Sequence, residues 1–392
     1  MPFFSNDAVN RVNLHTGVRA LAAGAGGVFF FVYLLRAGVS LPMALLAQAA
    51  IVGGRFCVRP LVLWPARRFG IKPMLITGTI VMALEYPLLA EVRGVGPMLA
   101  ALCVVAAIGD MFYWVAYNAY FAQIGDAEHR GSQIGAREAL VALIGIVAPL
   151  IGAGSLIAFG PRWTFDAAGL VQLSAVLPLI GAPNVPVPVE ARGAWRAARL
   201  AGGLMIADGW FDASYLMIWQ IALFLTLHES FAAYGGAIAL AGLVGAVAAL
   251  TFGRHIDLGG GRRAVTLTYG LAAILVVARA ASLGFPWLAV AANALGALLI
   301  PILSPTLGTA TSNLAKASPC SFRFAITTEG GWDVGCFFAC LVSAAIVAGG
   351  GSLAIPILLA LPAVLASALV LRRFYARAQG TMAAPAGVGE AV

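Results

Sequence analysis

The sequence is dominated by long apolar runs, about twelve of which fill residues 12–372 at roughly 18–25 residues each. An α-helix rises ~1.5 Å per residue, so about 20 apolar residues cross the hydrocarbon core of a bilayer. The chain is 61% hydrophobic and 10% charged, whereas a soluble domain carries about 25% charged residues. The sequence therefore predicts an integral membrane protein. A charge inside one of its spans costs roughly 2.5–3.5 kcal/mol on insertion scales and needs a reason.

We predict an all-α fold with twelve transmembrane helices. The expected spans are residues 14–35, 41–63, 73–92, 97–124, 134–159, 164–182, 203–226, 231–252, 264–284, 286–312, 325–347 and 353–371. Residues 183–202 contain three prolines followed by a basic run, which is typical of a polar linker. The sequence thus predicts an N-terminal six-helix bundle (1–182), a cytoplasmic linker (183–202) and a C-terminal six-helix bundle (203–392) with a short cytoplasmic tail.

The basic residues outside the spans fall mainly on one side of the expected membrane. That side carries Arg11, Arg67, Arg68, Lys72, Arg130, Arg192, Arg196, Arg199, Arg254, Arg262, Arg263, Lys316, Arg323, Arg372, Arg373 and Arg377. The other side carries Arg36, Arg93 and Arg162. The positive-inside rule places the first set and both termini in the cytoplasm, as expected for an inner or plasma membrane. The net charge of +8 therefore reflects topology, and we expect no nucleic-acid partner.

Several catalytic and metal-binding patterns are missing from the sequence. It has two lysines and no phosphate-binding GK[ST] loop, so it offers no site for ATP hydrolysis. It also lacks HExxH, GxSxG and CxxC motifs. We therefore expect no enzymatic activity, no metal and no cofactor, and we expect any transport to be driven by a gradient.

The two halves carry related basic turns between their second and third spans. In the first half this turn is Arg67-Arg68-Phe69-Gly70-Ile71-Lys72. In the second it runs from Gly253 through Asp257 to Gly261, Arg262 and Arg263. The second turn resembles the GxxxD…GRR signature of the major facilitator superfamily of secondary transporters. The first departs from it, with Leu63 and Arg67 at the glycine and acid positions.

The resemblance covers the whole chain in architecture. It implies two pseudo-symmetric six-helix bundles that rock around a central cavity lined by the first, fourth, seventh and tenth spans, a geometry for which this superfamily is itself a standard example. The fifth span contains Gly145, Pro149 and Gly152, in a pattern similar to the motif of the family's antiporters.

Two aspartates lie one helical turn apart on the seventh span. Asp208 and Asp212 are expected to share a helix face with Tyr215 and Trp219. The pair could simply face water at the cytoplasmic mouth. Alternatively, it could bind a proton or cation, because repulsion between close carboxylates favours a bound proton.

Further cavity candidates lie on the other spans that the resemblance places around the centre. Asp110, a third candidate for proton coupling, lies mid-span in 97–124. The substrate-cavity candidates are Arg19, Tyr113, Trp114, Tyr117, Asn118, Tyr215, Trp219 and Asn293. The aromatic residues could stack on a ring or a cation, or they could be core packing. Arg19 could snorkel to the interface, or pair with Asp110 or an anionic substrate. Glu85 and Arg279 fall on spans that are peripheral in the family and are interpreted as structural.

Two pairs of opposite charges occur at matching depths on the second and eleventh spans. Depth counting places Arg59 level with Glu329 and Arg55 level with Asp333. These helices meet across the domain interface in the resembled family. We therefore expect a two-rung ion-pair gate on the cytoplasmic side, closed when the cavity faces outward. The alternative is that the four groups are solvated separately or paired within one half. The loop residues Asp257, Arg262 and Arg263 are additional gate candidates.

Together these features predict a secondary active transporter that moves a small organic solute by alternating access. Proton-coupled antiport, and thus efflux, is favoured by the fifth-span motif. A proton-coupled symporter for uptake is the alternative, and a membrane assembly factor or a lipid flippase is less well supported. The expected partners are the lipid bilayer, protons and a small-molecule substrate, and the protein is expected to be monomeric.

Overall fold

The computed structural model describes residues 6–124, 130–252 and 261–383. Within these ranges the chain is helical and contains no β-strand. The first-half elements are α1 (Asp7–Ala25), η2 (Gly27–Phe29), α2 (Phe30–Arg36), α3 (Leu41–Val58), η3 (Arg59–Val62), α4 (Leu63–Phe69), α5 (Ile71–Ala90), α6 (Pro97–Ile124), α7 (Arg130–Ala158), α8 (Gly160–Ser174) and α9 (Leu177–Ile180). The second-half elements are α10 (Ala194–Asp212), η4 (Ala213–Met217), α11 (Ile218–Thr226), α12 (Phe231–Phe252), α13 (Gly261–Ala281), α14 (Pro286–Gly296), α15 (Ile300–Lys316), α16 (Ser321–Ala348), α17 (Ala354–Leu358) and α18 (Ala360–Ala383).

Eleven helical stretches in the described part of the chain are long and apolar enough to cross a membrane. They coincide with the expected spans except for residues 203–226, which are divided among α10, η4 and α11. The middle piece, η4, is a π-helical turn. Such a turn widens the helix and changes which residues share a face.

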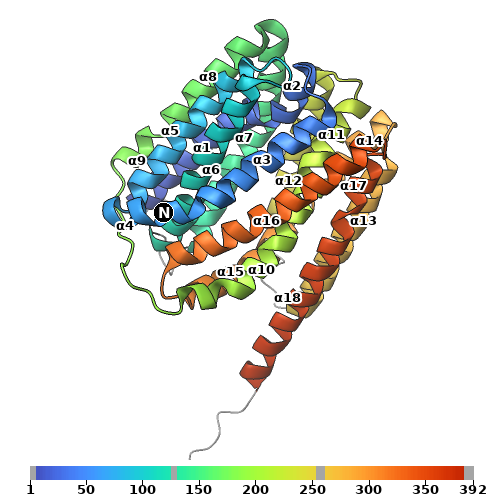
Figure 1. Cartoon of the computed structure of the whole chain (residues 1–392). Helices are drawn as coiled ribbons and strands as arrows, with labels where there is room; N and C mark the ends of the chain where they lie inside the picture. Colours follow the sequence, from blue (N-terminus) through green and yellow to red (C-terminus); the bar gives the residue numbers. More distant parts are fainter. Residues whose placement is uncertain (1–5, 125–129, 253–260, 384–392) are drawn as a thin grey trace, which may run out of the picture.

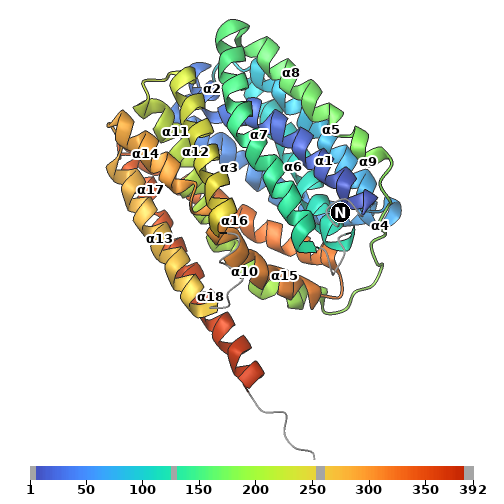
Figure 2. The same ribbon diagram turned by 180° about the vertical axis from the view of Figure 1, so that it is seen from behind.

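The helices form two groups (Figure 1), α1–α9 on one side and α10–α18 on the other. In the first group α1 packs on α7 and α8, and α5 packs on α6 and α8. In the second, α10 packs on α16 and α18. The groups meet along two seams, α3 against α16 and α7 against α12, and the second is visible from behind (Figure 2).

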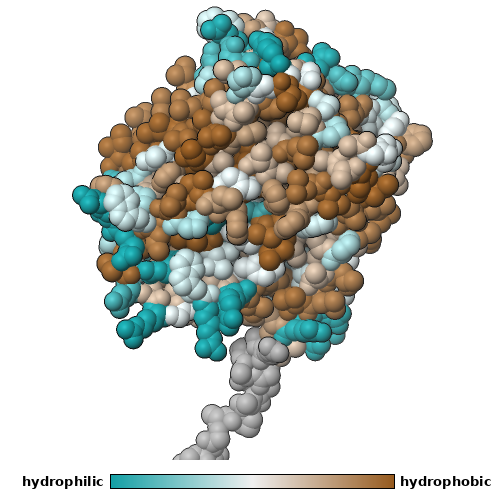
Figure 3. Space-filling view, in the orientation of Figure 1, coloured by the Kyte–Doolittle hydropathy of each residue, from teal (hydrophilic) through white to brown (hydrophobic). Residues whose placement is uncertain are grey.

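The surface has the polarity expected of a bilayer protein. A broad apolar belt separates hydrophilic residues at the two ends (Figure 3). We call the end that holds α4, α9, the start of α10 and the connection between α15 and α16 the basic end, because Arg67, Arg68, Arg196 and Lys316 lie there. The opposite end holds the connections α2–α3, α5–α6 and α11–α12.

Close helix contacts depend on glycine at the α10–α16 crossing. A methyl group on Gly209 of α10 would meet the carbonyl oxygen of Trp332, and one on Gly335 of α16 would meet the carbonyl oxygen of Ile206. Small residues permit this approach, and membrane helices gain their association energy from such packing rather than from a hydrophobic effect. The crossing fixes α16, and with it the acidic residues discussed below.

Two glycines of α10 offer a matched test of this packing. We predict that Gly209→Ala lowers the thermal unfolding temperature of the purified protein, because overpacking costs about 1–3 kcal/mol. Gly203→Ala, on the same helix but with open space around its Cβ position, should leave that temperature unchanged or slightly raised, since alanine is the better helix former. Equal unfolding temperatures for the two variants would contradict the close crossing.

Candidate functional site

A cavity of about 820 Å³ lies between the two groups of helices at the basic end. It is lined by residues of α6, α7, α10, α15 and α16 and by the connection between the last two. Its polar lining residues are Tyr117, Asn118, Gln123, Arg137, Thr311, Lys316, Ser318, Ser321, Thr328 and Glu329. Asn118, Gln123 and Lys316 are exposed, so the cavity opens to solvent at this end. Its volume lies in the range of small-molecule sites.

The opposite end of the interface is closed by aromatic packing. Phe29 of η2 meets the rings of Tyr234 and Phe231 edge-on, at centroid distances of 5.7 and 6.1 Å. The Tyr234 hydroxyl donates to the Val28 carbonyl oxygen at 3.1 Å. An ion pair between Arg36 and Glu229 (3.5 Å) also joins α2 to the α11–α12 connection at this end. The halves are therefore in contact here, while water reaches the interface from the basic end.

A cluster of five charged residues lies beside the inner part of the cavity. Arg55 of α3 contacts three carboxylates: Asp110 of α6 at 3.4 Å, Glu329 of α16 at 3.3 Å and Asp333 of α16 at 2.7 Å. Arg59 also pairs with Asp333. Glu329 connects the cluster to the cavity wall, because its second oxygen accepts a hydrogen bond of 2.8 Å from Asn118. We refer to Arg55, Arg59, Asp110, Glu329 and Asp333 as the ion cluster.

The members of the ion cluster differ in burial. The Asp333 side chain is 0% exposed, and those of Arg59 and Arg55 are 3% and 5% exposed. Glu329 and Asp110, at 15% and 22%, are closer to water. Removing a charge from water costs several kcal/mol, so Asp333 depends on both arginines, and they depend on it. The two outer carboxylates can exchange partners at lower cost.

The expected pairing of the two charged helices is partly present. Arg55 contacts Asp333, as depth matching predicts, but Arg59 pairs with Asp333 and not with Glu329. Arg59 Cδ lies 3.6 Å from the Cβ position of Gly330, so the long arginine side chain extends past Gly330 to Asp333 on the next turn. The result is a shared carboxylate instead of two separate rungs.

Other charged groups of the first half lie deeper than the cavity wall. Arg19 of α1 is stacked over the rings of Tyr113 and Trp114, at 4.8 and 4.7 Å from their centroids. It is within electrostatic range of Asp110, as is Glu85 of α5. A carboxylate oxygen of Glu85 is buried against Gly109 without a hydrogen-bond partner among the described residues. Glu85, interpreted from the sequence as structural, therefore lies next to the ion cluster.

Asp212 of the seventh span and the aromatic residues that follow it contact different helices. Asp212 accepts a hydrogen bond of 3.0 Å from Trp332 of α16. Tyr215 and Trp219 instead cover the guanidinium of Arg279 from α13, which donates to the Tyr215 carbonyl oxygen. The expectation of one shared face is wrong for Asp212, because the π-helical turn that begins at Ala213 changes the helical register. Asp208 has no ion pair in the described part of the chain.

The cavity wall contains two of the predicted cavity residues, Tyr117 and Asn118. The others, Arg19, Tyr113, Trp114, Tyr215, Trp219 and Asn293, do not line it in the described ranges. Asn293 is buried with both ends of its amide bonded, accepting from Trp219 and donating to the Ala237 carbonyl oxygen at 2.9 Å each. Tyr113, Tyr215, Trp219 and Asn293 are buried inside the two halves, whereas Arg19 and Trp114 are half-buried.

Sequence reasoning missed several residues that the structure places in or beside the cavity. Gln123, Lys316 and Thr328 line it, and so does Arg137, which donates to the Tyr117 hydroxyl at 3.1 Å. His15 is buried behind them, within 3.1 Å of the Tyr113 hydroxyl. Gln123 and Lys316 lie near helix ends, where polar residues are ordinary, so their position in the sequence carried no signal. Of the loop candidates, Arg262 and Arg263 are exposed at the start of α13, and Asp257 lies outside the described residues.

The fold has clear relatives among solved structures, although the sequence does not. No family model matches the sequence, and no curated protein matches it. The crystal structure of the human organic anion transporter MFSD10 (TETRAN) is similar with a TM-score of 0.68 and 15% identity, over 93% of this chain and 99% of that one. The crystal structure of the POT family transporter PepTSo has a TM-score of 0.67 and 12% identity, over 95% and 98%.

Both structures share one architecture with this protein over nearly their whole length. The chain has the fold of the major facilitator superfamily. At this level of identity the likeness concerns the fold alone.

The unequal burial in the ion cluster predicts unequal effects of neutral substitutions. Asp333→Asn leaves two buried arginines without their shared partner, and breaking a buried pair in this way costs about 3–5 kcal/mol. Glu329→Gln removes a more exposed carboxylate and should cost clearly less. Thermal unfolding of the two purified variants checks this order. If Glu329→Gln proved the more damaging change, Asp333 would not be the centre of the cluster.

Proposed function

We propose that the protein is a secondary active transporter that moves a small organic solute across a cell's inner or plasma membrane by alternating access. One observation carries this proposal: a polar cavity of about 820 Å³ between the halves of a major facilitator fold is open at one end, closed at the other, and bordered by a buried ion cluster. A binding space that opens to one side at a time is what alternating access requires. The two solved relatives are both described as transporters.

The cavity wall favours an amphipathic, charged solute. Arg137 and Lys316 contribute cations, Glu329 an anion, and Phe121 and Phe324 apolar faces. Rings and hydrophobic groups of a solute can pack on the aromatic residues, while its charged group finds an opposite charge nearby. One relative is described as an organic anion transporter, and the two cations support an anionic solute here as well.

Coupling to protons is the second part of the proposal. Asp208, Asp212 and Asp110 remain the candidate proton-binding residues. Asp212 is held by Trp332, and Asp110 shares Arg55 with two other carboxylates. Protonation of Asp110 or Glu329 weakens its hold on Arg55 and strengthens the competing pairs. Because the pairing of these carboxylates differs between the two states of the cavity, a proton binds to one state more tightly than to the other. This difference in proton affinity is what allows a proton to shift the balance between the two states.

We propose antiport, and thus efflux, ahead of symport for uptake. The fifth-span motif supports antiport, because it resembles the motif of the family's antiporters. Its Gly145 lies at the crossing of α7 and α12, where a methyl group on Gly242 would be 2.7 Å from the Gly145 carbonyl oxygen. A close crossing between the halves is a suitable place for a rocking contact. Symport for uptake remains the alternative.

We propose that the ion cluster holds the two halves together at a hinge, and that the contacts of its outer carboxylates change as the cavity opens and closes. It is formed while the cavity is open at the basic end, so the two halves need not separate there completely. Asp333 ties α16 to α3, and the outer link from Arg55 through Glu329 to Asn118 can tighten or loosen as the cavity closes. This modifies the simple gate expected from the sequence.

Topology and assembly are proposed from charge. The basic end carries Arg67, Arg68, Lys72, Arg196 and Lys316, and by the positive-inside rule it faces the cytoplasm, together with both termini. In this orientation the cavity faces inward. The protein is proposed to act as a monomer, because its one chain contains both halves that form the cavity.

Two further classes receive less support. A membrane assembly factor would be expected to offer large interaction segments, whereas α9 and α10 are joined by only a short connection. A lipid flippase needs a lateral route that accepts a polar headgroup. The lateral groove between α3 and α6 is lined by apolar residues and glycine, with Cys103 as its most polar group, and it offers no such route.

The transport proposal is tested with the purified protein in two steps. A thermal-shift screen of organic anions and other small amphiphiles identifies a ligand, and flux of that ligand into proteoliposomes is measured with an imposed pH gradient. We predict gradient-driven flux for the wild type, and flux near the level of protein-free liposomes for Asp212→Asn, because that variant cannot exchange a proton at this position. Asp7→Asn is the matched control, since Asp7 is an exposed carboxylate paired with Arg11. Wild-type flux without response to the gradient would contradict proton coupling. Wild-type flux in Asp212→Asn would remove this residue from the mechanism.

A further inference from the structure

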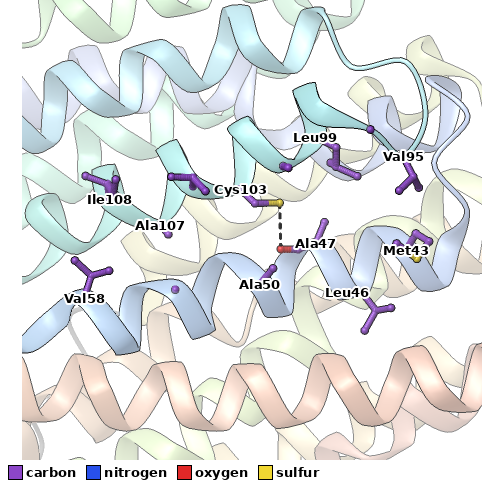
Figure 4. A pocket seen from close by; sticks show the side chains of 14 residues that line it. Met43, Leu46, Ala47, Ala50, Val58, Val95, Leu99, Cys103, Ala107 and Ile108 are labelled. Atoms are coloured by element: carbon purple, nitrogen blue, oxygen red, sulfur yellow. Dashed lines mark hydrogen bonds between the residues drawn. The ribbon is translucent and has the colours of Figure 1, made fainter.

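A second hollow lies on the outer face of the first half, away from the central cavity. It runs between α3 and α6, from Met43 and Val95 at one end to Val58 and Ile108 at the other (Figure 4). Its volume is about 500 Å³. We call it the α3–α6 groove.

The groove exists because both helices present small residues to it. Its floor and sides contain Ala47, Ala50, Gly54, Gly96, Ala100 and Ala107. The helices come closest at one point, where a methyl group on Gly54 would lie 3.0 Å from Ala107 Cβ. Elsewhere no large side chain fills the space between them. In a membrane, the side chains around an empty apolar recess lack dispersion contacts on one side, and a hydrocarbon chain that enters the recess supplies them.

The surroundings of the groove are apolar and exposed. Val95 and Val104 on its rim are 61% and 59% exposed, and Leu46 is 36% exposed. None of these three residues lines the central cavity. The most polar side chain in the groove, Cys103, contacts the Ala47 carbonyl oxygen at 3.7 Å. The residues that line the groove therefore offer no polar contacts to a lipid headgroup, but they can pack against an acyl chain.

The groove is more than long enough for the part of a lipid chain in one leaflet, and it runs in the direction of such a chain. From Met43 to Val58, α3 advances about 22 Å at ~1.5 Å per residue. One leaflet contributes about half of the ~30 Å hydrocarbon core. The groove follows the axes of two spanning helices, so a chain lying in it points along the membrane normal, as lipid tails do.

A cation marks the end of the groove where a headgroup would lie. Arg93 is exposed in the α5–α6 connection, which also contributes Val95 and Gly96 to the groove. Its hydrogen bonds within the described ranges all use Nη1, which donates to the Tyr33 hydroxyl and to the carbonyl oxygens of Ala90 and Val92. The remaining edge of the guanidinium, Nη2 and Nε, has no partner among the described residues. A phosphate is the anion that such an edge binds well.

We propose that the α3–α6 groove is a phospholipid site. It holds one acyl chain of a lipid from the leaflet at the end opposite the basic end, with the lipid phosphate on Arg93. This inference does not depend on the transport proposal.

A chain in this groove would lie directly behind the ion cluster. Gly54 precedes Arg55, and Ala107 and Ile108 precede Asp110 by three and two residues. The contact of Gly54 with Ala107 separates the lipid side from the charged side. The bound chain supports the thin α3–α6 seam from outside and keeps water from reaching Arg55 through it.

The site is tested by photo-crosslinking in nanodiscs that contain the full chain and a phospholipid with a diazirine in the middle of one acyl chain. Peptide mapping should place crosslinks on residues 43–58 and 95–108 several-fold above other lipid-facing segments. Ala100→Phe, which fills the groove, should abolish this enrichment. Ala366→Phe is the matched control, because Ala366 is equally an exposed alanine, on α18, and it should change nothing.

Two additional experiments distinguish the possible outcomes. Arg93→Gln should reduce the enrichment for the phospholipid and leave unchanged that for a diazirine fatty alcohol, which lacks a phosphate. If Ala100→Phe fails to fold, the smaller Ala50→Leu replaces it. Crosslinking in proportion to exposure on every lipid-facing helix, or enrichment that survives filling of the groove, would overturn the site. Enrichment that is insensitive to Arg93→Gln would overturn the phosphate contact.

Discussion

This structure depends on one constraint: charged side chains buried in an apolar medium, which cannot solvate them, must pair with one another. Asp333 has a fully buried side chain and pairs with Arg55 and Arg59 across the interface between the two groups of helices. None of these three groups would be tolerable alone in the apolar belt, because each would lose several kcal/mol of hydration without compensation. The pairing therefore fixes how α3 lies on α16. The glycine-rich crossing of α10 and α16 then determines where α10 lies, and with it Asp208 and Asp212.

The interface between the two groups of helices is closed by apolar packing at one end and open to solvent at the other. Phe29, Phe231 and Tyr234 close the end opposite the basic end with aromatic contacts that water cannot enter. At the basic end the walls carry exposed polar residues such as Gln123 and Lys316, and water keeps them solvated. The ion cluster lies between these regions. Its buried part ties the two halves together, and its more exposed carboxylates, Glu329 and Asp110, are the groups that we propose respond to a solute or a proton.

The sequence predicted the parts of this structure that follow from the length of each apolar run and from the depth of each charged residue in the membrane. The spans coincide with helices because about 20 apolar residues have one stable arrangement in a bilayer. The contact of Arg55 with Asp333 follows from counting residues along two helices that the family resemblance places side by side. The pairing of Arg59 could not be obtained in this way, because it depends on the conformation of the arginine side chain, which extends past Gly330 to Asp333. The face of Tyr215 was predicted wrongly because a π-helical turn leaves no mark in hydrophobic periodicity. The cavity wall was largely missed, since polar residues near helix ends resemble ordinary interfacial ones.

The shared carboxylate is tested most directly by a double-mutant cycle on Arg59 and Asp333, measured as the free energy of unfolding of the purified protein. Arg59→Met leaves Asp333 with Arg55 as its one arginine partner, and Asp333→Asn leaves the buried Arg59 without its carboxylate partner. The double variant removes the charges of both Arg59 and Asp333. We expect a coupling energy of about 1–3 kcal/mol, typical of directly interacting buried groups, with the double variant more stable than Asp333→Asn alone. Additive effects of the two substitutions would show that the pair does not hold the halves together, and would contradict an interface fixed by buried charge.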